Sequence, residues 1–299
     1  MPFSPFLLAL ALQVGPNPLG GAMPGDDLVR DRPPRAEVQP QREAEAKPDP
    51  VSAWLAGCLG VLEEDPARAH AMAQIRRAET TGADRVLANH CLGTAASALG
   101  LWQDARTAFT AARDETPESE PRARARFGAL AGSAALGGGD LEGAAGLLSQ
   151  SESDARAAKA ALLEAIAACD RGLVLSMLGR NDEALAALEN STALAPTRAE
   201  GWLIKAMVLR RLERLPEAQS AIERAASVTS GLSAVDAEIA LEAGVIAVLA
   251  GRDEAARKSW QSVIALAPDS LTANYARDYL AQIGEAGETA PATQEAPAS

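Results

Sequence analysis

Residues 172–196, GLVLSMLGRNDEALAALENSTALAP, contain a spaced series of small and apolar residues that decides the fold. Gly172 is followed after seven residues by Gly179, after five more by Ala184, after four by Leu188 and after eight by Pro196. The same intervals recur at Gly93, Gly100, Ala105, Phe109 and Pro117, and again at Gly244, Gly251, Ala256, Trp260 and Pro268. A spacing that recurs at three places indicates an internal repeat.

Each member of the series has a physical role in a pair of antiparallel helices. Gly172 and Ala184 allow the two helices to cross closely, because larger side chains would hold the backbones apart. Gly179 supplies the positive φ that ends the first helix, and Asp182 is predicted to be the N-cap of the second. Pro196 ends the second helix. The stretch therefore predicts one helical hairpin, and its copies predict an array of them.

Two further copies are degenerate. One keeps the spacing at Gly132, Gly139, Ala144 and Leu148 but has Arg156 at the proline position. The other keeps Ala206, Ala218 and Ile222, with Trp202 in its first helix, Glu213 in place of the turn glycine and Ser230 in place of the proline. The series resembles the tetratricopeptide repeat, as in bacterial proteins of that family. The resemblance implies an all-α, right-handed superhelical solenoid of antiparallel helix pairs; the alternative is a helical bundle without repeats.

The repeats divide the chain into segments. A divergent helix pair is expected over residues 51–82, where Asp65 and Pro66 have the chemistry of an N-cap and a first helical residue. A capping helix is expected over 271–283, and disordered segments over 25–50 and 284–299. Residues 120–124 and 159–164 are interpreted as short insertions between copies. The five recognisable repeats are predicted at 86–119, 125–158, 165–198, 199–232 and 237–270.

The first 24 residues contain an apolar run, from Phe6 to Val14, that has the length of a signal-peptide core and is too short to span a bilayer. No Lys or Arg precedes this run, which weakens the signal-peptide interpretation. The sequence favours a periplasmic or secreted protein, with a cytoplasmic protein as the alternative. The mature domain is not expected to insert into a membrane.

Composition excludes several kinds of partner and site. The chain has 28 Lys and Arg against 40 Asp and Glu, a formal net charge of −12, so we expect no nucleic-acid partner. Three cysteines and two histidines show no zinc-ligand spacing, and neither a matched nucleophile and base nor a phosphate-loop motif is present. We therefore expect no metal, no cofactor and no enzymatic activity.

The resemblance also implies where a partner binds. In tetratricopeptide arrays the first helix of each pair lines a concave groove that takes a peptide or a helix of another protein. Arg210 and Arg211, with Arg214 close by, form a cationic cluster that either captures an acidic or C-terminal group or lies on a solvated face. The groove-facing residues implied here are His90, Thr94, Ser97, Arg126, Ser133, Ser176, Met177, Glu200, Met207, Arg210, Arg211, Glu238 and Leu241.

The sequence thus predicts a non-catalytic scaffold for protein–protein interaction, acting in the cell envelope if the signal peptide is real. One alternative is an envelope assembly or structural protein that self-associates, so the oligomeric state stays open. A less favoured alternative is an enzyme or a small-ligand binder with its site in the groove.

The resemblance places Cys58 and Cys91 on the first helices of two neighbouring pairs, which pack side by side. They either form a disulfide, which requires export, or are two small buried thiols. Cys169 is expected to be a core residue.

Overall fold

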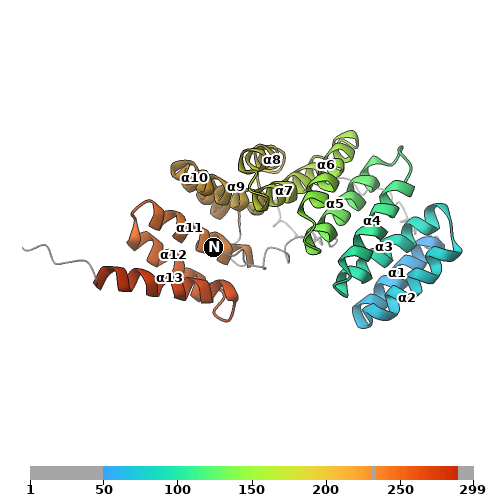
Figure 1. Cartoon of the computed structure of the whole chain (residues 1–299), viewed down its shortest axis with the longest axis horizontal. Coiled ribbons are helices and arrows are strands. Elements are labelled where there is room, and N and C mark those ends of the chain that lie inside the picture. Colours follow the sequence, from blue (N-terminus) through green and yellow to red (C-terminus); the bar gives the residue numbers. More distant parts are fainter. Residues whose placement is uncertain (1–49, 230–233, 289–299) are drawn as a thin grey trace, which may run out of the picture.

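The computed structural model describes residues 50–229 and 234–288, and all of its regular elements there are helices (Figure 1). The predicted signal peptide, the predicted linker up to residue 49 and residues 289–299 of the predicted tail lie outside these ranges. The helices are α1 Pro50–Glu64, α2 Pro66–Glu79, α3 Gly82–Ala98, α4 Trp102–Glu115, α5 Pro121–Gly137, α6 Leu141–Ala157, α7 Ala161–Met177, α8 Asn181–Leu194, α9 Ala199–Arg211, α10 Leu215–Ser227, α11 Ala234–Leu249, α12 Asp253–Leu266 and α13 Leu271–Glu288.

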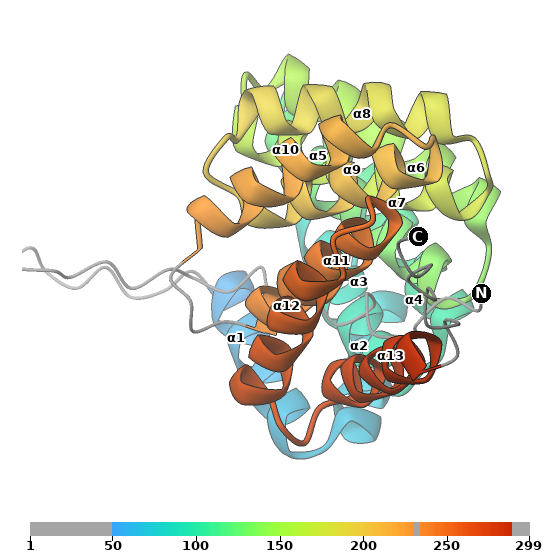
Figure 2. The ribbon, with the colours of Figure 1, turned by 90° about the vertical axis from the view of Figure 1, so that its left-hand side faces the viewer.

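Consecutive helices pack against each other, and the helices form an arch (Figure 1). First helices of most successive pairs also contact each other, as α7 contacts α9 and α9 contacts α11. Viewed from the C-terminal end, α8 and α10 lie on the outside with α7 and α9 beneath them (Figure 2). The chain is therefore an all-α, right-handed superhelical solenoid, which confirms the predicted fold class.

The spaced small residues lie where the two helices of each pair cross, as predicted. A Cβ atom placed on any of four glycines would lie 2.1–2.6 Å from a large side chain of the second helix. The close pairs are Gly93 with Phe109, Gly132 with Leu148, Gly172 with Leu188 and Gly244 with Trp260. In the copy without this glycine, Ala206 and Ile222 are both buried in one core cluster. Small residues at this position therefore set the distance between paired helices.

The turn glycines also have the expected backbone conformation. Gly179 has a φ of 76°, and the equivalent glycines in three other copies have φ values of 71–79°. In the remaining copy Glu213 occupies this position and keeps a positive φ of 60°. A side chain with a Cβ atom is strained in this conformation, so the fourth copy retains the turn at a cost in stability.

Replacing Glu213 by glycine is expected to raise the free energy of unfolding by about 0.5–1 kcal/mol, because glycine removes the strain but is more flexible when unfolded. The Glu213 side chain is exposed, so its removal should leave a small change in contacts. Urea denaturation measures the effect. The reverse change, Gly179→Glu, is the matched control and should destabilise the fold by about 1 kcal/mol. A less stable Glu213→Gly variant would contradict this account of the turn.

One of the two predicted helix caps is correct. The Asp65 carboxylate accepts a hydrogen bond from the backbone N–H of Arg68 at 2.9 Å, and Pro66 begins α2. Asp182, however, is not an N-cap, because α8 begins at Asn181 and Arg180 occupies the cap position without a side-chain cap bond. Asp182 lies inside the first turn, where a carboxylate still interacts favourably with the positive end of the helix dipole.

The predicted insertions are largely helical. Residues 121–124 form the first turn of α5, and residues 161–164 form the first turn of α7. Each of these helices has 17 residues, whereas α9 has 13. The capping helix is also longer than predicted, since α13 continues from residue 283 to Glu288. The chain therefore accommodates variable repeat length by adding turns to helices rather than by extending loops.

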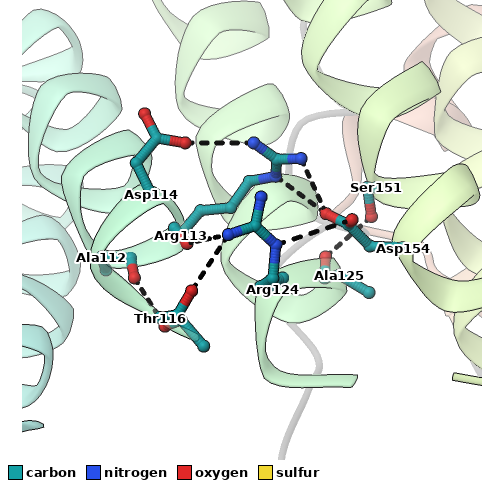
Figure 3. A network of polar contacts seen from close by, with 8 residues as sticks. All are labelled: Ala112, Arg113, Asp114, Thr116, Arg124, Ala125, Ser151 and Asp154. Atoms are coloured by element: carbon teal, nitrogen blue, oxygen red, sulfur yellow. Dashed lines mark hydrogen bonds and ion pairs between the residues drawn. The ribbon is translucent and has the colours of Figure 1, made fainter. Parts of the chain in front are cut away.

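Ionic contacts tie the added turns to the second helices around them (Figure 3). The Asp154 carboxylate of α6 accepts a hydrogen bond from the Arg113 Nε at 2.9 Å and lies 3.7 Å from the Arg124 Nε. Arg124, in the added turn of α5, also donates to the carbonyl oxygens of Arg113 at 3.3 Å and Thr116 at 3.0 Å. In the same way Arg156 is paired with Glu164 of the added turn of α7 at 2.6 Å. These contacts hold consecutive repeats together.

Replacing Asp154 by asparagine is expected to lower the free energy of unfolding by about 2 kcal/mol, because two guanidinium groups lose the carboxylate that they share. The side chains of Arg113, Arg124 and Asp154 are only 12%, 16% and 17% exposed, so water screens this loss poorly. Asp114→Asn is the matched control. Asp114 is paired with the same arginine but is 59% exposed, and its loss should change stability by less than about 0.5 kcal/mol. Equal effects at both positions would contradict this interpretation.

Candidate binding groove

Two adjoining pockets are lined mainly by the first helices of the pairs. We call them the apolar pocket and the acidic pocket. Both are lined by Ser133 and Leu136 of α5, so they are neighbours on one continuous surface. The superhelical course brings residues of successive repeats to this surface, and neither pocket is made by a single repeat.

The apolar pocket lies between α1, α3, α4 and α5. Its hydroxyl groups are partly engaged within their own helix, because Thr94 donates to the His90 carbonyl oxygen and Ser97 to that of Gly93, both at 2.9 Å. The pocket therefore offers mainly hydrocarbon and aromatic surface. It is lined by Leu62, Thr94, Ser97, Ala98, Trp102, Phe109, Leu130, Ser133, Ala134 and Leu136.

The acidic pocket lies between α5, α6, α7, α9 and α11. Three carboxyl groups reach it from three different helices: Asp170 from α7, Glu200 from α9 and Glu238 from α11. Arg198, just before α9, is the one cationic residue of its lining and lies 3.4 Å from Glu200. The other lining residues are Ser133, Leu136, Leu148, Ile166, Cys169, Leu173, Leu203 and Ile204. The pocket is thus an apolar cavity with an excess of carboxyl groups.

Burial changes the protonation of two of these carboxyl groups. It raises the pKa of Asp170 from 3.8 to about 7, with nearby Arg198 acting in the opposite direction and Glu200 in the same direction. Burial, helped by the Glu200 charge, likewise raises the pKa of Glu238 to about 7. One carboxyl oxygen of Glu238 has no exposed surface and no hydrogen-bond partner among the described residues. The two groups therefore change charge near neutral pH.

The arginine cluster proposed from the sequence is engaged within the chain. Arg210 is paired with the buried carboxylate of Glu242 at 2.5 Å. Arg211 donates to the Ser176 carbonyl oxygen at 2.9 Å and to the Ser176 hydroxyl at 2.6 Å. Arg214 is exposed and paired with Glu217. These contacts give Arg210 and Arg211 roles in joining α9 to α11 and α7, so the structure gives no support to capture of an acidic group by the cluster.

The remaining predicted groove residues fall into two groups. Thr94, Ser97, Ser133, Glu200 and Glu238 line the pockets. His90 packs edge-on against the Phe127 ring at 5.4 Å, and burial, together with nearby Arg126, lowers the pKa of His90 to about 4. Ser176 is buried, Met177 and Met207 pack against the core, Leu241 packs against the C-terminal core cluster, and Arg126 is exposed.

Sequence reasoning missed Asp170 and Arg198. Asp170 follows three small residues, Ala167, Ala168 and Cys169, which are buried in the first helix of the central repeat. The sequence feature that could have identified Asp170 is a charged residue placed directly after this run of small residues. Cys169 is buried as expected, and burial raises the pKa of its thiol strongly.

Cys58 of α1 and Cys91 of α3 form a disulfide in the structure, with their Cα atoms 6.4 Å apart. The two helices are the first helices of adjacent pairs and contact each other. The bond therefore joins the divergent N-terminal pair to the first recognisable repeat.

No described helix is both long enough and apolar enough to cross a membrane. No protein-family profile matches the chain, and no curated protein sequence shows a significant match. Solved structures do match. PilF of Pseudomonas aeruginosa aligns at 17% identity with a TM-score of 0.59, covering 78% of this chain and 97% of PilF. PilW, described as a widely conserved type IV pilus biogenesis factor, aligns at 16% identity with a TM-score of 0.60, covering 75% of this chain and 97% of PilW.

MamA of Desulfovibrio magneticus RS-1 aligns at 16% identity with a TM-score of 0.50, covering 62% of this chain and 97% of MamA. At these identities the likeness bears on fold alone. PilF, PilW and MamA are tetratricopeptide-repeat proteins, and the chain shows the helix pairs, crossing glycines and turn glycines implied by that repeat. The chain therefore has the tetratricopeptide-repeat fold.

Proposed function

We propose that this protein is a non-catalytic scaffold whose inner groove binds a segment of another protein. The observation that carries the proposal is the pair of adjoining pockets, which are lined by first helices of successive repeats and share Ser133 and Leu136. Two neighbouring pockets of different chemistry suit consecutive side chains of one peptide segment.

We further propose that the protein acts in the cell envelope. A disulfide between Cys58 and Cys91 is favoured in an oxidising compartment, and the apolar run near the N-terminus suits export. The description of PilW as a pilus biogenesis factor makes an envelope assembly partner a reasonable class to search first.

The test is a quantitative crosslinking pull-down from the native host with the full chain as bait. Ser133→Trp places a bulky ring where the two pockets meet and should remove the specifically enriched partner. Ser149→Trp is the matched control, because Ser149 is exposed on outer helix α6. Ser97→Trp blocks the apolar pocket alone and serves as a second test variant in case Ser133→Trp does not fold. Thermal unfolding checks that all three variants are folded. Retention of the partner by folded Ser133→Trp would overturn the groove proposal.

Self-association is separated from this function by a different measurement. A scaffold that binds a foreign segment should keep one solution mass over a wide range of protein concentration. Mass that rises with concentration in analytical ultracentrifugation would favour the self-assembling alternative.

A further inference from the structure

We infer that the acidic pocket binds the side chain of a lysine or arginine carried by the bound segment. This inference specifies the class of segment that the groove takes, and it rests on the proposed function. Asp170, Glu200 and Glu238 converge on the pocket, and Arg198 is the one cationic residue that faces them from its lining. Since Arg198 is paired with Glu200, two carboxyl groups remain to be balanced.

These two groups lack partners within the described part of the chain. No hydrogen bond or ion pair there reaches the carboxyl group of Asp170, a half-buried residue. The Glu238 oxygen that has no exposed surface is also unpaired. Carboxyl groups that are partly or fully removed from water and have no donors cost free energy, and a ligand that supplies N–H groups and positive charge would recover it.

The walls of the pocket indicate what carries that positive charge. Ile166, Leu173 and Leu203 line the same cavity as the carboxyl groups, so the pocket offers hydrocarbon surface beside them. Lysine and arginine side chains have this composition, with an apolar stem and a charged end. No group of three His, Cys, Asp or Glu residues in the described ranges is placed to hold a metal ion, and the excess of carboxyl groups repels anions.

The neighbouring pocket refines the specificity. Because the apolar pocket shares Ser133 and Leu136 with the acidic one, an extended segment that places a basic side chain in the acidic pocket passes beside the apolar pocket. The preferred segment therefore combines a basic residue with a nearby large apolar residue. The net charge of −12 also attracts basic segments at long range.

Binding of a cation should be coupled to proton release. The charged groups that act on Asp170 are Arg198 and Glu200, and Glu200 is the one that acts on Glu238. A bound cation favours the ionised form of both carboxyl groups, whose pKa values are about 7 in the free protein. Affinity for a basic segment should therefore be high at pH 8 and fall as the pH is lowered to 5.5.

The experiment uses the full chain and fluorescent peptide pools that are acetylated and amidated at their ends. Each pool has lysine, norleucine or glutamate at one fixed position and a mixture of residues around it. Fluorescence polarisation at pH 8 should show at least tenfold tighter binding of the lysine pool than of the norleucine pool. The combined change Asp170→Asn with Glu238→Gln should abolish this preference, and lowering the pH to 5.5 should reduce it.

The matched control is Asp182→Asn with Glu189→Gln, which removes the same two charges from exposed positions on outer helix α8 and should keep the preference. Equal binding of the lysine and norleucine pools, or an unchanged preference in the Asp170 and Glu238 variant, would overturn the inference while leaving the groove proposal standing. Failure of every pool to bind, or binding that folded Ser133→Trp retains, would overturn the groove proposal itself.

Discussion

Asp170→Asn is expected to raise the free energy of unfolding by about 2–4 kcal/mol at pH 8 and to change it little at pH 4. Burial raises the pKa of Asp170 to about 7 in the folded chain, whereas an aspartate in the unfolded chain has its ordinary value near 4. Between pH 4 and pH 7 the folded state therefore binds more protons than the unfolded state. Stability falls as the pH rises through this window, and above pH 7 the full penalty remains. Asparagine has a similar shape and cannot ionise, so it removes the penalty.

Urea denaturation at several pH values between 4 and 8 measures this effect. Asp278→Asn is the control, because Asp278 is exposed on α13, far from the acidic pocket along the chain. The difference between the Asp170 variant and the unchanged protein should grow from pH 4 to pH 7 and then level off. A variant that is less stable than the unchanged protein at every pH would show that the Asp170 carboxylate supports the fold, and the prediction would be wrong.

A carboxyl group that weakens the fold at neutral pH needs a reason to be there. Functional sites commonly retain residues that lower stability, because binding requires groups that the fold alone would not select. Asp170 fits this pattern, since it lines a pocket and has no hydrogen-bond partner among the described residues. The urea denaturation therefore tests what the Asp170 carboxylate costs the fold, and the peptide measurement tests what it contributes to binding.

The sequence was sufficient for the features that lie within one helix pair. The interval of sixteen residues from Gly172 to Leu188 places the two side by side across a hairpin, so a local spacing predicts a tertiary contact. The turn at Gly179 is equally local. Even Glu213, which departs from the pattern, follows the conformation that its position implies.

The helix boundaries were less predictable for a physical reason. Adding four residues to the start of α5 or α7 adds about one full turn, since a helix has about 3.6 residues per turn. The apolar face beyond the added turn keeps its direction, so a pattern of apolar residues does not distinguish an extra turn from an extra loop. Contacts such as that of Arg124 with Asp154 reveal the difference, and they join residues that are 30 positions apart in the sequence.

The acidic pocket depends on the superhelix and lies beyond a reading of single repeats. Asp170, Glu200 and Glu238 belong to three successive repeats: Glu200 and Glu238 occupy the same position in theirs, and Asp170 lies four positions further along in its own. Their approach depends on how α7, α9 and α11 pack side by side. The sequence singled out Glu200 and Glu238 as residues facing the groove, but it gave no sign that the carboxyl group of Asp170 lies with theirs.

Loss of the disulfide between Cys58 and Cys91 is expected to lower the free energy of unfolding by about 3.5 kcal/mol. The two cysteines are 33 residues apart in the sequence, and a cross-link over this distance lowers the conformational entropy of the unfolded chain by about that amount. The double variant Cys58→Ala with Cys91→Ala measures this loss by urea denaturation under oxidising conditions. Adding a reducing agent should destabilise the unchanged protein by a similar amount. The same reagent should have no effect on the double variant, which controls for reduction elsewhere.

The effect should be concentrated at the N-terminal end of the array. The pair α1 and α2 lies at that end of the described array and contacts α3 on one side, so it has fewer packing partners than an internal pair. Terminal units of a solenoid open more readily than internal ones, and the cross-link opposes this opening by holding α1 against α3. Hydrogen exchange of residues 50–79 should accelerate strongly on reduction, while α7 and α9 change little. Uniform acceleration along the chain, or two alkylated thiols at Cys58 and Cys91 in protein taken from the periplasm, would contradict the cross-link.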